Sequence, residues 1–302
     1  MNMDRRQFIK TTGGVAVVGP IETLPWFRSI SSQDRSANAR VAVFFEESFP
    51  AEQSPVPDRD LIAAALKGCE TTFLNVRELA SRLSSDSSDL FIMPYGSAFP
   101  KEAWPAISRY LMSGGNWVNL GGVPFSVPVV RQGSTWRKET RQTAYHKSLG
   151  ITQAFPVSPS TVTRYQATAP SELLHAIAQS FNAEELYALY VRFTSSKDFP
   201  SEDGSSGPRD AVIKPLLNGV GDDGNSVVAP LVCIDRLLGE GAGARWVLAN
   251  YKGIITKEMI AATVDIALEG VAELLVRPSF ACYKEGDVPS FAVSVRRPGG
   301  GI

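Results

Sequence analysis

The chain is poor in the residues on which most nucleophilic and metal chemistry depends. Its 302 residues include only three cysteines and two histidines. No Cys-x-x-Cys or His-x-x-x-His spacing occurs, so we predict no transition-metal site and no cofactor. Cys69, Cys233 and Cys282 are interpreted as small apolar residues of the core. A disulfide between two of them stays open, because the sequence cannot give the pairing.

An excess of charge of one sign and a long apolar run are also missing. The formal net charge is -1, and no basic run interleaved with aromatic residues occurs, which argues against a nucleic-acid partner. No apolar stretch approaches the roughly 20 residues that span a bilayer, so we expect no stable membrane span. With 44% apolar residues, the chain can nevertheless bury a substantial core.

Apolar runs and helical patterns alternate along the first part of the chain. The patterns predict strands over residues 40–45, 71–75 and 90–93 and at the start of the segment 114–125, and helices over 59–67 and 101–112. A strand, a helix and a second strand in this order form a parallel crossover. Repeated units of this kind predict an α/β fold with an open, doubly wound, mostly parallel sheet of the flavodoxin-like type.

The middle of the chain gives a more mixed pattern. It predicts helices over residues 171–181 and 256–268, and strands over 186–193, 211–217, 226–235 and 244–250. Ser171 is a helix-capping residue in this scheme. The polar stretch 194–209 is interpreted as an exposed loop, because its acidic residues lack the ligand spacing of a calcium loop.

Residues 114–125 are the most informative segment. They predict a strand followed by a tight turn at Gly121 and Gly122, where glycine gives the backbone the freedom a sharp turn requires. A catalytic nucleophile would normally lie at such an elbow, but this segment places none there.

Three of these segments resemble the class I glutamine amidotransferase-like superfamily. They are the first strand ending in Phe44-Phe45-Glu46-Glu47, the strand Asp-Leu-Phe-Ile-Met-Pro-Tyr-Gly, and the strand and elbow Gly-Gly-Asn-Trp-Val-Asn-Leu-Gly-Gly. The resemblance covers residues 41–125 and continues more loosely to about residue 275. More narrowly, the chain is similar to catalytically silent versions of this domain that are appended to bacterial glycoside hydrolases, including the trimerisation domain of β-galactosidases.

Active members of the family place a cysteine in a Gly-x-Cys-x-Gly elbow, and this position falls near Leu120 or Gly121 here. Amide transfer requires a thiolate and an imidazole that lowers its pKa. The departure therefore implies a module without thiol catalysis. His175 is interpreted as an ordinary helix residue, while His146 either faces the carboxyl edge of the sheet or is a surface or hydrogen-bonded structural histidine.

The carboxyl edge of the predicted sheet supplies the ligand-binding candidates. These are Glu46, Glu47, Tyr95, Ser97, Gly121, Gly122 and Phe125. Aromatic faces and carboxylates suit a saccharide; alternatively, the aromatic rings cap the core and the glutamates are solvated. No catalytic residue is assigned, since adjacent glutamates on a strand point to opposite faces and glycoside hydrolysis needs two facing carboxylates. Ser97 lacks a Gly-x-Ser-x-Gly elbow.

The two ends of the chain carry different patterns. Arg5 and Arg6, a following Phe-Ile, an apolar stretch and Ala37-Asn-Ala39 resemble a twin-arginine export signal with its cleavage site; a chance Arg-Arg pair is the alternative. Near the C-terminus, two alternating segments around residues 284–287 predict a hairpin that resembles the start of an immunoglobulin-like β-sandwich. We therefore expect a signal and linker over 1–39, an α/β domain over 40–276 and a hairpin over 277–302.

The function predicted from the sequence is a non-catalytic amidotransferase-like module of an exported, periplasmic or extracellular, carbohydrate-active protein, with a structural or sugar-binding role. A carbohydrate ligand, a downstream catalytic domain and a homo-oligomer are the expected partners. Two alternatives remain: a glycoside hydrolase that uses Glu46 or Glu47, and a stand-alone sugar-binding module. The sequence identifies neither the ligand nor the oligomeric state.

Overall fold

The computed structural model describes residues 38–192, 210–271, 273–278, 282 and 284–296. Arg5 and Arg6 of the predicted export signal lie outside the described residues, as does the predicted loop 194–209. Both remain predictions.

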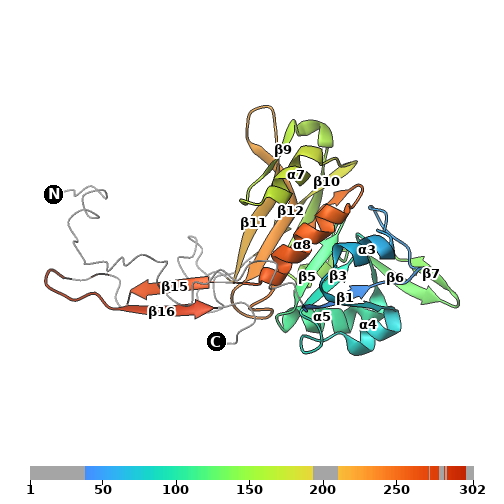
Figure 1. Ribbon diagram of the computed structural model, residues 1–302, viewed down its shortest axis with the longest axis horizontal. Helices are drawn as coiled ribbons and strands as arrows, with labels where there is room; N and C mark the ends of the chain where they lie inside the picture. Colours follow the sequence, from blue (N-terminus) through green and yellow to red (C-terminus); the bar gives the residue numbers. More distant parts are fainter. Residues whose placement is uncertain (1–37, 193–209, 272, 279–281, 283, 297–302) are drawn as a thin grey trace.

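The body of the molecule is built on an eight-stranded sheet in the order β2-β1-β3-β5-β13-β12-β11-β9 (Figure 1). Its strands are β1 (Arg40–Phe44), β2 (Glu70–Leu74), β3 (Leu90–Met93), β5 (Asn116–Leu120), β9 (Arg164–Ala167), β11 (Ala211–Val220), β12 (Ser226–Arg236) and β13 (Arg245–Ala249). The first five strands of the sheet pair in parallel. Their order is one of the common doubly wound orders, which confirms the α/β architecture expected from the sequence.

The other half of the sheet is antiparallel. Strand β12 pairs antiparallel with both β13 and β11, and β11 pairs antiparallel with β9. A tight turn joins β11 to β12, because the amide of Gly224 donates to the carbonyl of Gly221 at 3.1 Å. A strand that returns through such a turn must run antiparallel. The sheet is therefore mixed, and the expectation of a mostly parallel sheet holds only for its first half.

Helices cover both faces of the sheet. Helices α3 (Arg59–Ala65), α7 (Glu172–Ser180) and α8 (Lys257–Glu269) lie on one side, and α4 (Val76–Arg82) and α5 (Trp104–Met112) lie on the other (Figure 1). Helix α7 lies over the antiparallel strands β9 and β11, and the others lie over the parallel half. Along β1, Val41 and Val43 belong to one hydrophobic core while Ala42 and Phe44 belong to the other. Strands covered on both faces are apolar throughout, which explains the continuous apolar runs in the sequence.

Several elements are not among those expected from the sequence. Helix α4 begins at a capping box in which the Asn75 side chain accepts from the amide of Glu78 and the Glu78 carboxylate accepts from the amide of Asn75. Two further sheets are β14-β10-β8 and β4-β6-β7. Their strands are β4 (Ala98–Pro100), β6 (Val127–Gln132), β7 (Thr135–Lys138), β8 (Ile151–Val157), β14 (Tyr251–Lys252) and β10 (Glu185–Val191), of which β10 corresponds to the strand predicted over 186–193. Helix α6 (Ala144–Ser148) precedes β8.

The predicted C-terminal hairpin is present. Strands β15 (Glu273–Pro278) and β16 (Phe291–Arg296) pair antiparallel, and Figure 1 shows them to one side of the α/β body. Their membership of an immunoglobulin-like domain and the domain boundaries remain predictions.

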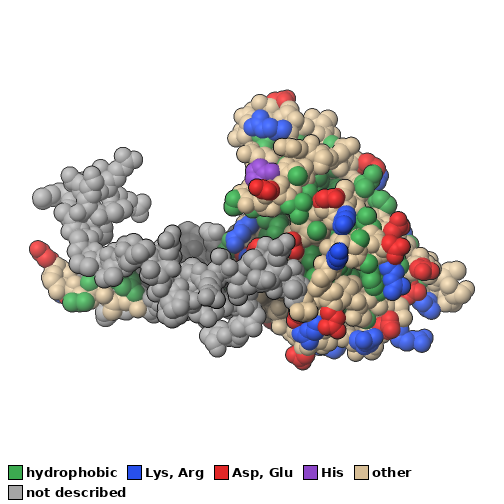
Figure 2. Space-filling model, in the orientation of Figure 1, with side chains coloured by type: hydrophobic (Ala, Val, Ile, Leu, Met, Phe, Trp, Pro, Cys, Tyr) green, Lys and Arg blue, Asp and Glu red, His purple; other side chains and the backbone are tan. Residues whose placement is uncertain are grey.

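The visible face of the body carries acidic and basic side chains interspersed with apolar ones (Figure 2). Among the described residues, no helix is both long and apolar enough to cross a membrane.

Candidate functional site

The glycine elbow lies at the carboxyl edge of the parallel strands, directly after β5. Gly121 and Gly122 have φ angles of 84° and 68°, in the left-handed region that glycine adopts readily. The amide of Gly122 donates to the carbonyl of Tyr251 at 2.8 Å, and the amide of Gly96 donates to the carbonyl of Leu120 at 3.2 Å. The ends of β3, β5 and β13 therefore meet at this turn.

A segment from elsewhere in the chain fills the elbow. Residues 51–57, which we call the crossing segment, follow β1 and run over the carboxyl edge. Glu52 forms an isolated parallel bridge with Gly96. The Ser54 hydroxyl donates to the carbonyl of Tyr251 at 3.0 Å and accepts from the amide of Gly253 at 3.2 Å. These bonds fix the crossing segment against the elbow.

This packing leaves no room for a side chain at the elbow. A Cβ atom at Gly121 would lie less than 3.0 Å from Oγ and Cβ of Ser54. A Cβ atom at Gly122 would lie equally close to Oε1 of Gln53 and Oγ of Ser97. Neither Gly121 nor Gly122 could therefore carry a side chain without displacing Ser54, Gln53 or Ser97.

Gln53 makes the most specific contact of the crossing segment. Its Oε1 accepts from the amide of Val123 at 3.0 Å and from the hydroxyl of Ser97. The residue has a φ of 74°, which is uncommon for a residue other than glycine. Its Nε2 is buried and has no hydrogen-bond partner among the described residues.

The structure gathers most of the predicted ligand-binding residues at this edge, but it buries several of them. Ser97 is fully buried beside the elbow, and Tyr95 and Phe125 are 2% and 1% exposed. The Phe125 ring stacks on Trp117 with 4.7 Å between ring centroids. The Tyr95 hydroxyl donates to the carbonyl of Glu46 at 2.7 Å, and burial raises its pKa to about 12.

The two glutamates lie apart from the elbow contacts. The Glu46 carboxylate accepts from the amide of Val76 at the first turn of α4, at 3.4 Å, and lies 4.0 Å from the Arg131 guanidinium. A carboxylate at a helix N-terminus stabilises the helix. Glu47 is exposed. Ligand binding by Glu46 or Glu47 remains a prediction.

A cleft of about 720 Å³ opens beside the elbow. It is lined by Glu52, Gln53, Val123, Ser126, Arg141, Gln142, Thr143, His146, Ala154, Pro156, Glu185, Tyr187 and Lys252. Its charged groups pair with one another or with neighbours. Glu52 pairs with Lys138 at 2.8 Å and with Arg141 at 3.6 Å, and Lys252 lies 3.8 Å from Glu185. The charged groups of the cleft are therefore paired, and they stand in a wall that also contains the apolar side chains of Val123, Ala154 and Pro156.

His146 belongs to the wall of this cleft. It is 2% exposed, and its Nδ1 lies 3.1 Å from the carbonyl of Pro124. Because a carbonyl only accepts, Nδ1 carries the proton in this bond. Burial lowers the pKa of His146, so the ring is neutral at pH 7 and Nε2 is an acceptor. Nε2 has no partner within the described part of the chain. Both sequence hypotheses for His146, the sheet edge and a structural hydrogen bond, hold together.

Tyr187, Arg141 and Gln53 are not candidates in the sequence analysis. Tyr187 lies on β10, whose pattern identifies a strand but not the face that meets the cleft. Its hydroxyl donates to the Glu185 carboxylate. Only the fold brings β10, α6 and the crossing segment together, so no local signal marks them as neighbours.

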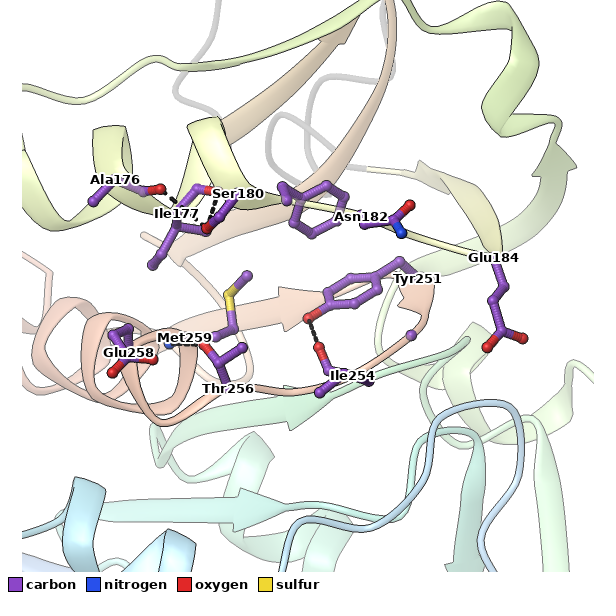
Figure 3. A pocket seen from close by; sticks show the side chains of 12 residues that line it. Ala176, Ile177, Ser180, Asn182, Glu184, Tyr251, Ile254, Thr256, Glu258 and Met259 are labelled. Carbon is purple, nitrogen blue, oxygen red and sulfur yellow. Dashed lines mark hydrogen bonds between the residues drawn. The ribbon is translucent and has the colours of Figure 1, made fainter.

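A second cavity, of about 440 Å³, lies on the other side of β14, between the end of α7 and the start of α8 (Figure 3). Tyr251 and Met259 lie side by side in its wall, and the Tyr251 hydroxyl donates to the carbonyl of Ile254 at 3.3 Å. The Phe181 ring packs against Tyr251 with 4.8 Å between ring centroids. The cavity therefore combines an apolar wall with a polar rim, and it is separated from the elbow by Tyr251.

The cysteines lie away from the elbow. Cys233 is buried in β12, and burial raises its pKa to about 12. Cys69 is half-buried before β2, and burial raises its pKa as well. Cys282 is exposed. None of the three, all of which belong to the described residues, is joined to another, and raised pKa values oppose thiolate formation.

No protein-family model and no curated protein sequence matches the chain. Among solved structures, it is similar to the β-galactosidase from Bacillus circulans sp. alkalophilus, at 11% identity and a TM-score of 0.42, over 76% of this chain and 30% of that one. It is also similar to Gan42B, a GH42 β-galactosidase from G. stearothermophilus, at 12% identity and a TM-score of 0.40, over 80% and 31% of the two chains.

A GMP synthase-like protein from Thermoplasma acidophilum is similar over 76% of this chain and 94% of that one, at 7% identity and a TM-score of 0.35. The chain spans about 30% of the length of the β-galactosidases. Similarities this distant carry no argument about activity. The fold and site on their own define a mixed α/β module in which side chains fill the elbow and a cleft with paired charges lies beside it.

Proposed function

We propose that this chain is an amidotransferase-like module that performs no thiol chemistry and binds a carbohydrate in the cleft beside the elbow. The observation that carries the proposal is the filled elbow. Ser54 and Gln53 occupy the space that a side chain at Gly121 or Gly122 would need. The residue resemblance to the amidotransferase-like superfamily and the doubly wound order of the parallel strands support the same interpretation.

The chemistry of the cleft favours an uncharged, hydroxyl-rich ligand. Its carboxylates and cations already pair, as Glu52 does with Lys138 and Arg141, so no net charge remains to select an ion. Tyr187, Gln142 and Thr143 add neutral polar side chains to the wall, whereas Gln53 Nε2 and His146 Nε2 are buried beneath its surface. Sugars offer both donors and acceptors from each hydroxyl, which matches this mixture.

A hydrolase that uses Glu46 or Glu47 has less support. The Glu46 carboxylate accepts from the first turn of α4 and lies near Arg131, and neither glutamate lines the cleft. Hydrolysis would also require a second carboxylate facing the first across the scissile bond.

Export by the twin-arginine route, with a periplasmic or extracellular location, is part of the proposal and rests on Arg5 and Arg6. Assembly with a downstream catalytic domain, or with further copies of this chain, is also part of it. Under this proposal the module serves a carbohydrate-active protein by binding its carbohydrate ligand, or by contacting its catalytic domain or further copies of the chain.

Calorimetric titration with a panel of β-linked oligosaccharides tests the binding role. We expect saturable binding by the wild-type chain, weakened about 5–10-fold in Tyr187→Phe, because a neutral hydrogen bond contributes about 1–1.5 kcal/mol. Tyr190→Phe is the matched control, since Tyr190 lies on the same strand but is 67% exposed and outside the cleft. No heat of binding with any oligosaccharide, or equal losses in the two variants, would contradict a sugar site in this cleft.

A further inference from the structure

The cavity between the end of α7 and the start of α8 combines a buried apolar floor with an acidic rim (Figure 3). Ile177, Tyr251 and Met259 form the floor and are 6%, 1% and 3% exposed. The half-buried Phe181 sets its ring against Tyr251 at an interplanar angle of 73°. A volume of about 440 Å³ has room for an aromatic ring and is typical of small-molecule sites.

Hydrogen bonds within the fold fix the walls of this cavity. The Tyr251 hydroxyl donates to the carbonyl of Ile254 at 3.3 Å, which holds the loop that follows β14. Thr256 caps α8, because its side chain accepts from the amide of Met259 at 3.2 Å. A ligand would therefore not have to order these walls, which lowers the free-energy cost of binding.

The rim carries an excess of negative charge. Of the described residues that line the cavity, two are glutamates and none is lysine, arginine or histidine. Lys252 is shared between Glu184, at 2.9 Å, and Glu185, at 3.8 Å. Glu258, at the opposite end of the cavity from Glu184 (Figure 3), forms no ion pair within the described part of the chain. The N-terminus of α8 offsets about half a charge there, so the rim remains negative.

We propose that this cavity binds a primary ammonium ion carried on an apolar ring, with the ring on the floor and the ammonium group at Glu258. Burial of the ring supplies most of the affinity. The carboxylate selects the positive charge, and it lies at the exposed rim, where the ammonium group keeps part of its hydration. The site lies outside the proposed sugar cleft, so either proposal can fail without the other.

Three small molecules, each differing in one feature, test the site in the full-length chain. Phenethylammonium carries ring and charge, 2-phenylethanol lacks the charge, and ethylammonium lacks the ring. We expect phenethylammonium to shift the ¹³C–¹H methyl resonance of Met259 saturably and to leave that of Met93, in the other core, unchanged. The dissociation constant should be about 3–5-fold larger for 2-phenylethanol, as for loss of a hydrated ion pair, and about 10-fold larger or more for ethylammonium.

Glu258→Gln tests the carboxylate. It should weaken phenethylammonium about 3–5-fold and leave 2-phenylethanol unchanged. Glu172→Gln is the matched control, because Glu172 is also exposed in the first turn of a helix, α7, but does not line the cavity. This control should leave the affinities for all three molecules unchanged.

Ala176→Trp tests the cavity independently of its charge. Ala176 is exposed on α7 and lines the cavity, so an indole there should fill the space and abolish the Met259 shift with phenethylammonium and 2-phenylethanol alike. The proposal is overturned if phenethylammonium gives no saturable shift, binds no more tightly than 2-phenylethanol, or binds Ala176→Trp as it binds wild type. Equal weakening by Glu258→Gln and Glu172→Gln overturns it as well.

Discussion

An alanine at Gly121 is expected to destabilise the folded chain by about 2–6 kcal/mol. Left-handed backbone costs about 1–3 kcal/mol for a residue with a Cβ atom, and overpacking a filled site costs about 1–3 kcal/mol more. The overlap is with Oγ and Cβ of Ser54. Ser54 cannot turn away easily, because its hydroxyl bonds to Tyr251 and Gly253. Urea denaturation of the variant and wild type measures the difference.

Gly133→Ala is the matched control for this prediction. Gly133 also has a left-handed φ, of 62°, but a Cβ there would meet nothing within 4 Å. The Gly133→Ala variant should therefore lose only the free energy that an alanine costs in left-handed backbone. Combining Gly121→Ala with Ser54→Gly should recover part of the loss, as expected for residues in contact. Equal destabilisation by Gly121→Ala and Gly133→Ala would show that the elbow has room for a side chain.

Asp235→Asn is expected to destabilise the chain by about 3 kcal/mol, because it removes the buried counter-charge of Arg245 and leaves it only the half-exposed Glu269, 3.1 Å from its Nη1. Asp235 is 2% exposed in β12, and its carboxylate accepts from Arg245 Nε at 2.6 Å and from Lys214 Nζ at 2.6 Å. Arg245 is 9% exposed and cannot regain water without opening the sheet. The pair lies at the sheet edge opposite the elbow, so the substitution tests the fold and should leave ligand binding by the remaining folded chain unchanged.

Asp89→Asn serves as the control for Asp235→Asn. Asp89 pairs with Arg40 at 2.7 Å, but both side chains are more than 40% exposed. Exposed pairs contribute about 0–1 kcal/mol, so the loss should be several-fold smaller. Equal losses of unfolding free energy in Asp235→Asn and Asp89→Asn would contradict the claim that burial gives the Asp235 pair its larger contribution.

The same pair makes stability depend on pH. Burial alone would raise the pKa of Asp235, but hydrogen bonds from Arg245 and Lys214 outweigh it and hold the pKa below its ordinary value of 3.8. A carboxyl group with a lowered folded-state pKa contributes fully above its unfolded pKa and loses that contribution as the pH falls through the folded value. The difference in unfolding free energy between wild type and Asp235→Asn should therefore be constant near neutral pH and shrink below about pH 4.

Much of the fold can be predicted from local pattern. The buried runs of β1, β3 and β5, the glycine stop after α5 and the capping serine of α7, whose side chain accepts from the amide of Leu174, all carry their signal within a few residues. The antiparallel half of the sheet could not be predicted in this way, because the apolar pattern of a strand does not show whether it pairs parallel or antiparallel with its neighbour. Helix α4 has its signal in Asn75 and Glu78, a capping-box pair that could have been recognised from the sequence.

The closed elbow could be predicted only in part. The glycines at 121 and 122 mark the turn, but the groups that fill it come from far along the chain. Gln53 is 70 residues from Val123 and 44 from Ser97, and no periodicity links them. Likewise, Glu46 lies at the predicted edge of the sheet, but its bond to the start of α4 depends on a helix that the sequence analysis does not include.

Ammonia release from glutamine distinguishes an elbow without a nucleophile from a catalytic one, because an elbow without a nucleophile cannot form a thioester. Ammonia release from glutamine should be measured for the wild-type chain and for Cys69→Ser and Cys233→Ser at matched protein concentrations. The account predicts no release above the protein-free rate for any of the three. Turnover by the wild-type chain that disappears in Cys69→Ser or Cys233→Ser would contradict it.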